Sequence, residues 1–226
     1  MAPRLLLLLM LLSRVPAQEL NLRAIVHGNY NMTKVGFRVW HAISMASDDM
    51  TRIGENGDLR VFIEKIESLN DGGLKFSFHF MLLGDCVEAA VVCQKTDKNG
   101  EHSLDYKGSG RVLLWETDYR LYVTFYIRSV NNGTVTQVLA LYGRFSDLGP
   151  SFLARFEKIC KRYGIGPQNI IDLTSQAHLY HKVIITGNEG VDATQGTYHQ
   201  CWLRTVPAIM MVENEPHQPT RGSAPA

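Results

Sequence analysis

Apolar and polar residues alternate along most of the chain between residues 59 and 142, which is the period of a β-strand with one buried face. The apolar members of the successive stretches are Leu59, Val61, Ile63; Phe76, Phe78, Phe80; Val87, Ala89, Val91, Cys93; Leu104, Tyr106; Val112, Leu114; Val123, Phe125, Ile127; and Val138, Ala140, Tyr142. Turn residues that tolerate positive φ, such as Asn56-Gly57 and Asn132-Gly133, separate them. Successive hairpins without crossover helices predict an all-β, antiparallel, up-and-down barrel. Periodicity alone would equally describe a β-sandwich.

After the last alternating stretch, the period changes to that of a helix. Apolar positions recur there at three- and four-residue intervals and share one helical face: Phe152, Phe156, Ile159, Cys160 and Tyr163. Gly164 follows and tolerates the left-handed backbone that ends many helices. This pattern predicts one C-terminal α-helix packed outside the barrel.

The two ends of the chain differ from this central region. Residues 1–17 contain Arg4, the apolar run Leu5–Leu12 and the small-residue pattern Val15-Pro16-Ala17, which indicates a secretory signal peptide. The run is too short for the alternative, an uncleaved membrane anchor. Residues 18–178 form the predicted domain. Residues 179–226 have weak periodicity and finish in a Pro-, Glu-, Gly- and Ser-rich segment, so we expect a partly disordered tail.

Composition narrows the function classes. Removing residues 1–17 takes away Arg4 and Arg14 and no acid, which leaves 21 basic and 22 acidic residues and a net charge of −1. A chain without an excess of basic residues does not have the positive surface that nucleic-acid binding requires. Two sequons fit a secreted glycoprotein, at Asn31 and at Asn132, and the second lies on a predicted hairpin tip. We find no Gly-x-Ser-x-Gly, His-Glu-x-x-His or Cys-x-x-Cys motif, so we expect no enzyme, no metal and no cofactor.

Several longer motifs carry a family resemblance. They are Asn56-Gly57-Asp58-Leu59-Arg60-Val61-Phe62, Lys95-Thr96-Asp97-Lys98-Asn99-Gly100-Glu101, Thr117-Asp118-Tyr119, Leu141-Tyr142-Gly143-Arg144 and Asn169-Ile170-Ile171-Asp172-Leu173-Thr174. Together they resemble the lipocalin family, and within it the pheromone- and odorant-binding branch. The resemblance covers roughly residues 20–177 and implies an eight-stranded barrel, which is wide enough to hold one small ligand.

The resemblance also implies a ligand cavity inside the barrel. The matching positions are Leu59, Val61, Ile63, Phe76, Phe78, Val91, Leu104, Tyr106, Val112, Phe125, Ile127, Val138, Ala140 and Tyr142. The hydroxyls of Tyr106 and Tyr142 could orient a polar group of the ligand. The alternative is that these side chains fill the barrel. Phe125 favours it, because the pheromone binders tend to carry a smaller residue there.

One end of a lipocalin barrel is closed by a Gly-x-Trp motif whose tryptophan packs beneath an arginine of the last strand. The resemblance gives these roles to Trp40 and Arg144, and a guanidinium over an indole face is a favourable contact. Here Arg38 replaces the glycine. Arg38 does not adopt a glycine-only backbone conformation cheaply, so either the start of the first strand is rerouted or the chain folds poorly there.

The cysteines depart from the family as well. The resemblance implies that Cys86 bonds to a cysteine shortly after the Ile-Ile-Asp-Leu segment, but none follows there. Cys201 could substitute from the tail, which makes Cys86–Cys201 a hypothesis. Cys160 is expected to be a buried hydrophobe and Cys93 to point into the barrel. A lipocalin-fold isomerase uses such an internal thiol, although from a different strand.

Three functions remain open at this stage. The first is a secreted extracellular carrier for one small hydrophobic molecule, and the resemblance implies male reproductive tract fluid and odorant, retinoid or steroid-like ligands. The second is a filled-barrel glycoprotein that contacts a receptor, another protein or the sperm surface. The third is a thiol-dependent isomerase that uses Cys93, which lacks an evident base or low-pKa environment.

Overall fold

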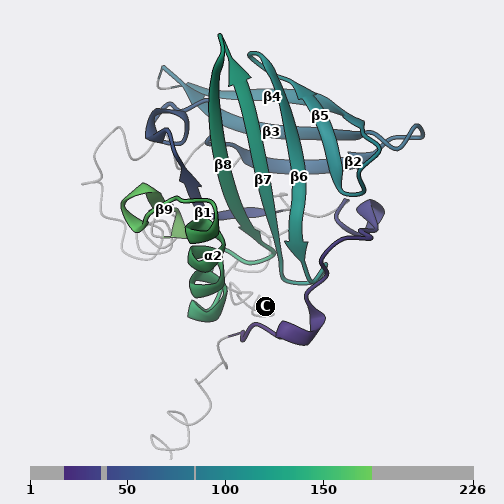
Figure 1. Cartoon of the computed structure of the whole chain (residues 1–226), viewed down its shortest axis with the longest axis vertical. Helices are drawn as coiled ribbons and strands as arrows, with labels where there is room; N and C mark the ends of the chain where they lie inside the picture. The colour runs from purple at the N-terminus through teal and green to yellow at the C-terminus, as the bar shows by residue number, and fades with distance from the viewer. Residues whose placement is uncertain (1–17, 37–39, 84, 175–226) are drawn as a thin grey trace, which may run out of the picture.

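A computed structural model describes residues 18–36, 40–83 and 85–174 (Figure 1). The predicted signal peptide, residue 38 and the tail beyond residue 174 lie outside these ranges. Among the described residues the strands are β1 (His41–Ser47), β2 (Phe62–Ser68), β3 (Leu74–Leu82), β4 (Asp85–Lys95), β5 (Glu101–Asp105), β6 (Ser109–Thr117), β7 (Tyr122–Asn131), β8 (Thr134–Gly143) and β9 (Ile170–Asp172). The helices are α2 (Pro150–Arg162) and the 3-10 turns η1 (Leu22–Ala24), η2 (Met32–Lys34), η3 (Met50–Arg52) and η4 (Pro167–Asn169).

The strands form one antiparallel sheet in the order β2-β3-β4-β5-β6-β7-β8-β1-β9, which confirms the predicted up-and-down topology. Two details differ from the prediction. The described residues contain nine strands rather than eight, because the short β9 pairs with β1 beyond the barrel proper. The hydrogen-bonded ladder is also not closed, since β1 and β2 are not paired although their Cα atoms come within 8 Å of each other.

At the predicted turns the backbone has positive φ, a conformation that glycine and asparagine adopt readily. Asn56 has φ of 59°, and in the β7–β8 hairpin Asn132 and Gly133 have φ of 49° and 81°. Gly108 has φ of 122°, and a Cβ atom there would lie 2.2 Å from the carbonyl oxygen of Val130. The β5–β6 turn and the end of β7 therefore meet so closely that only glycine fits at this position.

Helix α2 covers the outer face of the sheet over β1, β7 and β8 (Figure 1). Its buried residues, Phe152, Phe156, Ile159 and Cys160, belong to the face predicted from the sequence, and Gly164 after its end has φ of 75°. They pack against the outward-facing side chains of the strands, Ile43, Tyr122, Leu139 and Leu141. The described residues thus form two apolar cores, one between helix and sheet and one inside the barrel.

Irregularities in two strands redirect side chains. In β2 the register shifts between Ile63 and Lys65, so the next fully buried position after Ile63 is Ile66. In β6 the register shifts between Leu114 and Glu116, and Glu116 pairs with Thr124. Because Thr124 alternates with the inward Val123 and Phe125, the bulge turns Glu116 to the outer side, toward α2.

Candidate functional site

One end of the barrel is closed by Trp40 and Arg144. The guanidinium carbon of Arg144 lies 3.4 Å from the centroid of the Trp40 ring, the stacked arrangement expected from the sequence. Trp40 is 2% exposed, and its indole Nε1 donates a hydrogen bond to the carbonyl of Val35 at 3.0 Å. The backbone nitrogen of Arg144 donates to Leu121 at 2.8 Å, which ties β8 to the β6–β7 turn at the same end.

The Thr117-Asp118-Tyr119 motif builds that turn. The Thr117 hydroxyl donates to the carbonyl of Tyr122 at 2.6 Å, and the Asp118 carboxylate accepts backbone N–H bonds, including one from Leu121 at 2.8 Å. Tyr119 has φ of 61°, and its hydroxyl accepts a bond from the backbone of Asn31 at 2.9 Å. These contacts give the motif a structural role. The effect of Arg38 concerns residues outside the described ranges.

The barrel interior holds an apolar cavity of about 60 Å³. Its walls are Leu59, Val61, Ile63, Phe76, Phe78, Val91, Cys93, Leu104, Tyr106, Val112, Phe125, Ile127 and Tyr142. All of these except Cys93 are among the ligand-binding positions proposed from the sequence. Val138 and Ala140, also proposed, belong to the same buried cluster but do not line the cavity.

Aromatic side chains occupy part of the barrel interior and so limit the volume of the cavity. Phe125 on β7 meets Phe76 on β3 edge-on with ring centroids 5.8 Å apart, and meets Tyr142 on β8 at 6.1 Å. Such tilted aromatic pairs are favourable contacts in their own right. The resulting space is less than half the volume of an engineered apolar cavity of roughly 150 Å³ that binds benzene. The large side chain at Phe125 therefore fills part of the barrel without eliminating the cavity.

The thiol of Cys93 faces this cavity from β4. Burial raises the pKa of Cys93 to about 12, so the thiol stays protonated at neutral pH. The residues around the cavity include no histidine, carboxylate or amine that could take its proton. Because the thiolate is the reactive form, the geometry does not favour nucleophilic or isomerase chemistry here. The described part of the chain also contains no group of three His, Cys, Asp or Glu residues that could hold a metal ion.

The other cysteines bear on the disulfide hypothesis. Cys86 is disulfide-bonded, whereas Cys93 and Cys160 are free and buried. Cys201, the partner that we proposed for Cys86, lies outside the described residues. The Cys86–Cys201 pairing therefore stays a prediction, to be checked by peptide mapping without reduction.

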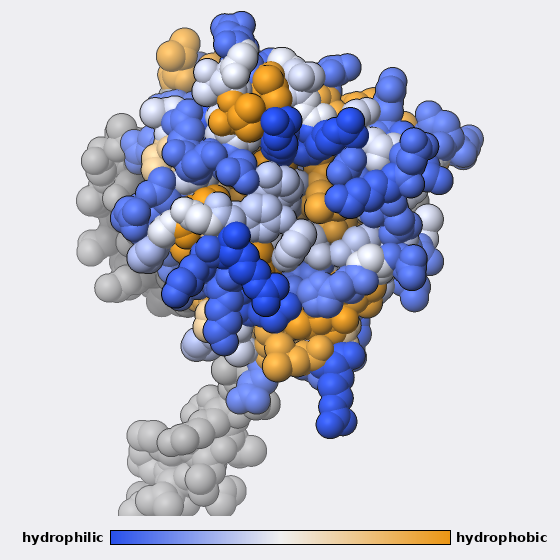
Figure 2. All heavy atoms as spheres, in the orientation of Figure 1, coloured by the Kyte–Doolittle hydropathy of each residue, from blue (hydrophilic) through white to orange (hydrophobic). Residues whose placement is uncertain are grey.

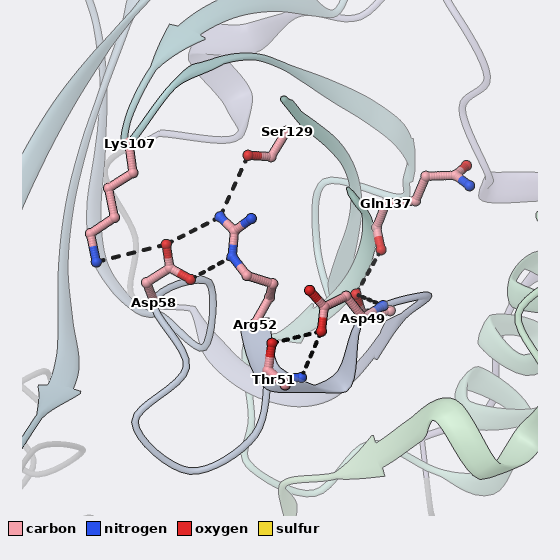
Figure 3. Close-up of polar contacts among 8 residues, drawn as sticks. Asp49, Thr51, Arg52, Asp58, Lys107, Ser129 and Gln137 are labelled. Carbon is pink, nitrogen blue, oxygen red and sulfur yellow. Dashed lines mark hydrogen bonds and ion pairs between the residues drawn. The ribbon is translucent and has the colours of Figure 1, made fainter. Parts of the chain in front are cut away.

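The other end of the barrel carries a polar network that pattern analysis did not predict (Figure 3). Arg52 binds the Asp58 carboxylate through two hydrogen bonds, from Nε at 2.6 Å and from Nη2 at 3.1 Å. The same Nη2 lies 3.5 Å from the hydroxyl of Ser129 on β7. Lys107, in the β5–β6 turn, lies 3.8 Å from Asp58.

This network fixes the connection between β1 and β2, residues 48–61, across the end of the barrel opposite Trp40. The side chains of Arg52 and Asp58 are only 14% and 15% exposed. The Leu59 backbone N–H donates to the carbonyl of Arg52 at 2.9 Å, which closes the connection into a compact loop. Leu59 and Val61, which follow Asp58, form part of the cavity wall. The ion pair therefore holds one wall of the cavity in place.

The described strands form an up-and-down antiparallel β-barrel with an apolar cavity inside, a stacked tryptophan and arginine at one end and one helix outside. The interior of a barrel of this size is either filled by side chains or holds one small ligand. The family model for the Lipocalin / cytosolic fatty-acid binding protein family matches residues 38–177, and the chain belongs to this family. This confirms the family resemblance read from the sequence motifs.

Comparison with individual proteins agrees. The chain is 50% identical over 172 residues to epididymal-specific lipocalin-9 of Mus musculus, covering 76% of this chain and 96% of that protein. The protein of the same name from Homo sapiens is 47% identical over 178 residues, covering 79% and 92%. The structure of possum milk whey lipocalin trichosurin with bound 4-ethylphenol superposes with a TM-score of 0.58 at 29% identity, covering 61% of this chain and 96% of that chain.

Figure 2 shows a largely hydrophilic face on which hydrophobic side chains gather in small separate groups. Large apolar side chains that are exposed in the described part of the chain are Leu22, Leu82, Leu83, Val92, Val135 and Phe145. No described helix is long and apolar enough to cross a membrane. Both sequon asparagines, Asn31 and Asn132, are exposed.

Proposed function

We propose that the protein is a secreted extracellular carrier that binds one small hydrophobic molecule inside its barrel, once residues 1–17 have been removed. The observation that carries this proposal is the cavity inside the barrel, because the residues that line it are apolar apart from two tyrosines and one cysteine. Binding would remove apolar ligand surface from water at roughly 25 cal/mol per Å², less the entropy lost on association. Covalent chemistry is not required.

The similar proteins support the setting and the ligand class. A lipocalin that is 29% identical holds 4-ethylphenol, a single-ring molecule with one polar group. The relatives at 47–50% identity are named as epididymal-specific, which supports male reproductive tract fluid as the place of action. The small cavity favours compact molecules of odorant size over retinoids or steroids.

The test is a titration of the secreted, purified chain with 4-ethylphenol, by isothermal calorimetry and native mass spectrometry. We expect saturable binding of one molecule per chain, displaced by other small apolar compounds. A folded protein that takes up neither 4-ethylphenol nor a hydrophobic fluorophore would contradict the carrier proposal.

The second candidate is a filled barrel that acts through its surface and glycans on another protein or the sperm surface. The contact between Phe76 and Phe125, which narrows the cavity, is the observation that favours it. Against it, the face shown in Figure 2 carries its hydrophobic side chains in separate groups. Failure of the titration above, in a folded protein, would leave this candidate as the better one.

Asp58→Asn is expected to speed ligand release. The substitution removes the charge that Arg52 and Lys107 contact, so the connection that carries Leu59 and Val61 opens more often. Because the pair is mostly buried and doubly hydrogen-bonded, we expect a loss of about 1–2 kcal/mol of local stability, or about a tenfold faster dissociation rate. Stopped-flow displacement of a bound fluorophore measures this rate.

The matched control for Asp58→Asn is Glu101→Gln. This substitution breaks an ion pair with Arg111, a residue whose side chain is 56% exposed, and neither residue lines the cavity. Equal dissociation rates in the two variants would show that the Arg52–Asp58 pair does not restrain the ligand.

A further inference from the structure

Gln18, the first residue that the structure describes, is held against the start of helix α2. Two positions further on, the Leu20 backbone N–H donates to the hydroxyl of Ser151 in the first turn of this helix at 3.0 Å. Gly149 caps the helix and is buried, and a Cβ atom there would collide with the carbonyl oxygen of Gln18. The backbone of residue 18 therefore packs on the helix end instead of projecting into solvent.

The side-chain amide of Gln18 lies in an unfavourable environment. Its oxygen is buried and has no hydrogen-bond partner among the described residues. A polar group that loses water on burial without gaining a partner costs free energy. A free amino terminus at this residue adds an ammonium group with three N–H donors to the two donors of the amide. A form of residue 18 with fewer N–H groups and no charge therefore fits this position better.

The charge of the chain terminus matters at this place. Removal of residues 1–17, as predicted from the sequence, makes Gln18 the first residue, and a free α-amino group carries a positive charge at neutral pH. The start of a helix also carries a partial positive charge, so a cation beside it is destabilising. The first turn of α2 contains no acidic residue, and Glu19, the acid nearest in sequence, is exposed. The helix end therefore favours an uncharged terminus.

We propose that Gln18 is a modification site, at which the new chain terminus cyclises to pyroglutamate and the neutral ring packs on the start of α2. The α-amino nitrogen attacks Cδ of its own side chain and forms a C–N bond. The bond from Cδ to Nε2 breaks, and the departing nitrogen takes up the proton of the amine and leaves as ammonia. No oxidant or reductant is required. The proposal rests on the secreted form in the proposed function, because Gln18 cyclises only as the first residue.

The test of the modification is the intact mass of the full chain, freshly secreted from mammalian cells and freed of glycans. The mass is measured before any proteolytic digestion, because N-terminal glutamine also cyclises slowly during digestion. We expect a protein that begins at residue 18 and is lighter than its encoded sequence by one ammonia. Gln18→Ala is the matched control, since alanine has no side-chain amide and this variant should keep its encoded mass.

The packing of the ring is tested with pyroglutamyl aminopeptidase, which removes pyroglutamate from an accessible chain end. We expect this enzyme to act on the folded wild type about tenfold more slowly than on Gly149→Ala, in which the added methyl group displaces the segment at Gln18. Gly149 has φ of −57° and ψ of 157°, which alanine also adopts, so the variant keeps the backbone of the helix start. Unfolding both proteins in urea should remove the difference.

A secreted chain that begins at residue 18 with its full encoded mass would overturn the modification and leave the carrier function intact. A chain that begins at another residue would overturn the predicted cleavage position and the modification together. Equal rates of pyroglutamate removal from the folded wild type and Gly149→Ala would overturn the packing of the ring on α2. The titration with 4-ethylphenol tests the carrier function separately, so the two failures are distinguishable.

Discussion

Phe125→Ala is expected to convert the small cavity into one that accepts bulkier ligands, while lowering the free energy of unfolding by about 3–5 kcal/mol. Phe125 is 2% exposed and touches both Phe76 and Tyr142, so its removal leaves a void continuous with the existing cavity. We expect affinity for a two-ring apolar ligand to rise about tenfold. That gain corresponds to about 1.4 kcal/mol, or about 60 Å² of additional buried apolar surface. Denaturant unfolding and calorimetry measure the two effects.

Phe156→Ala is the matched control for the cavity variant. Phe156 is 1% exposed but packs between α2 and the outer face of the sheet, in the other core. This variant should lose comparable stability without changing the ligand range. If Phe125→Ala binds the same compounds as the wild type with the same affinities, the ring does not limit the cavity. Phe125→Leu provides a milder truncation that keeps more stability.

Arg155→Leu is expected to lower the free energy of unfolding by about 3 kcal/mol, because it leaves the Glu116 carboxylate buried without its countercharge. Glu116 is fully buried, and the Arg155 guanidinium, 23% exposed, contacts it through Nη2 at 2.8 Å and Nε at 3.2 Å. The hydrogen bond to Glu116 raises the pKa of Arg155, so the guanidinium stays charged. The Tyr122 hydroxyl donates to the same carboxylate at 3.1 Å.

The double variant Glu116→Gln, Arg155→Leu tests this explanation. It removes the uncompensated charge while keeping an acceptor for Tyr122, so we expect it to regain at least half of the stability that Arg155→Leu loses. Thermal and denaturant unfolding of the single and double variants at neutral pH give the comparison. A double variant as unstable as the single one would show that Arg155 contributes by packing rather than by neutralising Glu116.

The spacing of apolar residues predicted the strands and the helix, because a half-buried strand repeats every two residues and a half-buried helix every three or four. The alternation in β3, β6 and β7 assigned inward positions that the structure places around one cavity, and the three- and four-residue spacing predicted α2 and its buried face. Val138 and Ala140 show the limit of this approach. Their place in the alternation puts them on the inner face of β8, where they join the buried cluster. They do not line the cavity, because that also depends on how far the neighbouring side chains extend into the barrel.

Features that depend on distant residues could not be predicted in this way. The alternation of residues in β6 does not predict the bulge that turns Glu116 outward. Its partner, Arg155, lies 39 residues further along the chain. The pairing of Arg52 with Ser129 spans 77 residues for the same reason. The two cavity tyrosines look equivalent in sequence, yet only the three-dimensional packing decides that Tyr142 reaches a carbonyl while Tyr106 does not. The ninth strand was missed because it is three residues long.

The unpaired boundary between β1 and β2 has a mechanical consequence. At every other junction of the barrel wall, from β2 round to β1, backbone hydrogen bonds join the neighbouring strands, so separating them breaks a ladder. Between β1 and β2 the described residues form no such ladder, although Cα atoms of the two strands come within 8 Å of each other. The circumference of the barrel can therefore grow at this one seam without losing backbone hydrogen bonds. A ligand larger than the cavity of the unliganded barrel could enter there if β1 and β2 move apart, without unfolding of the other strands.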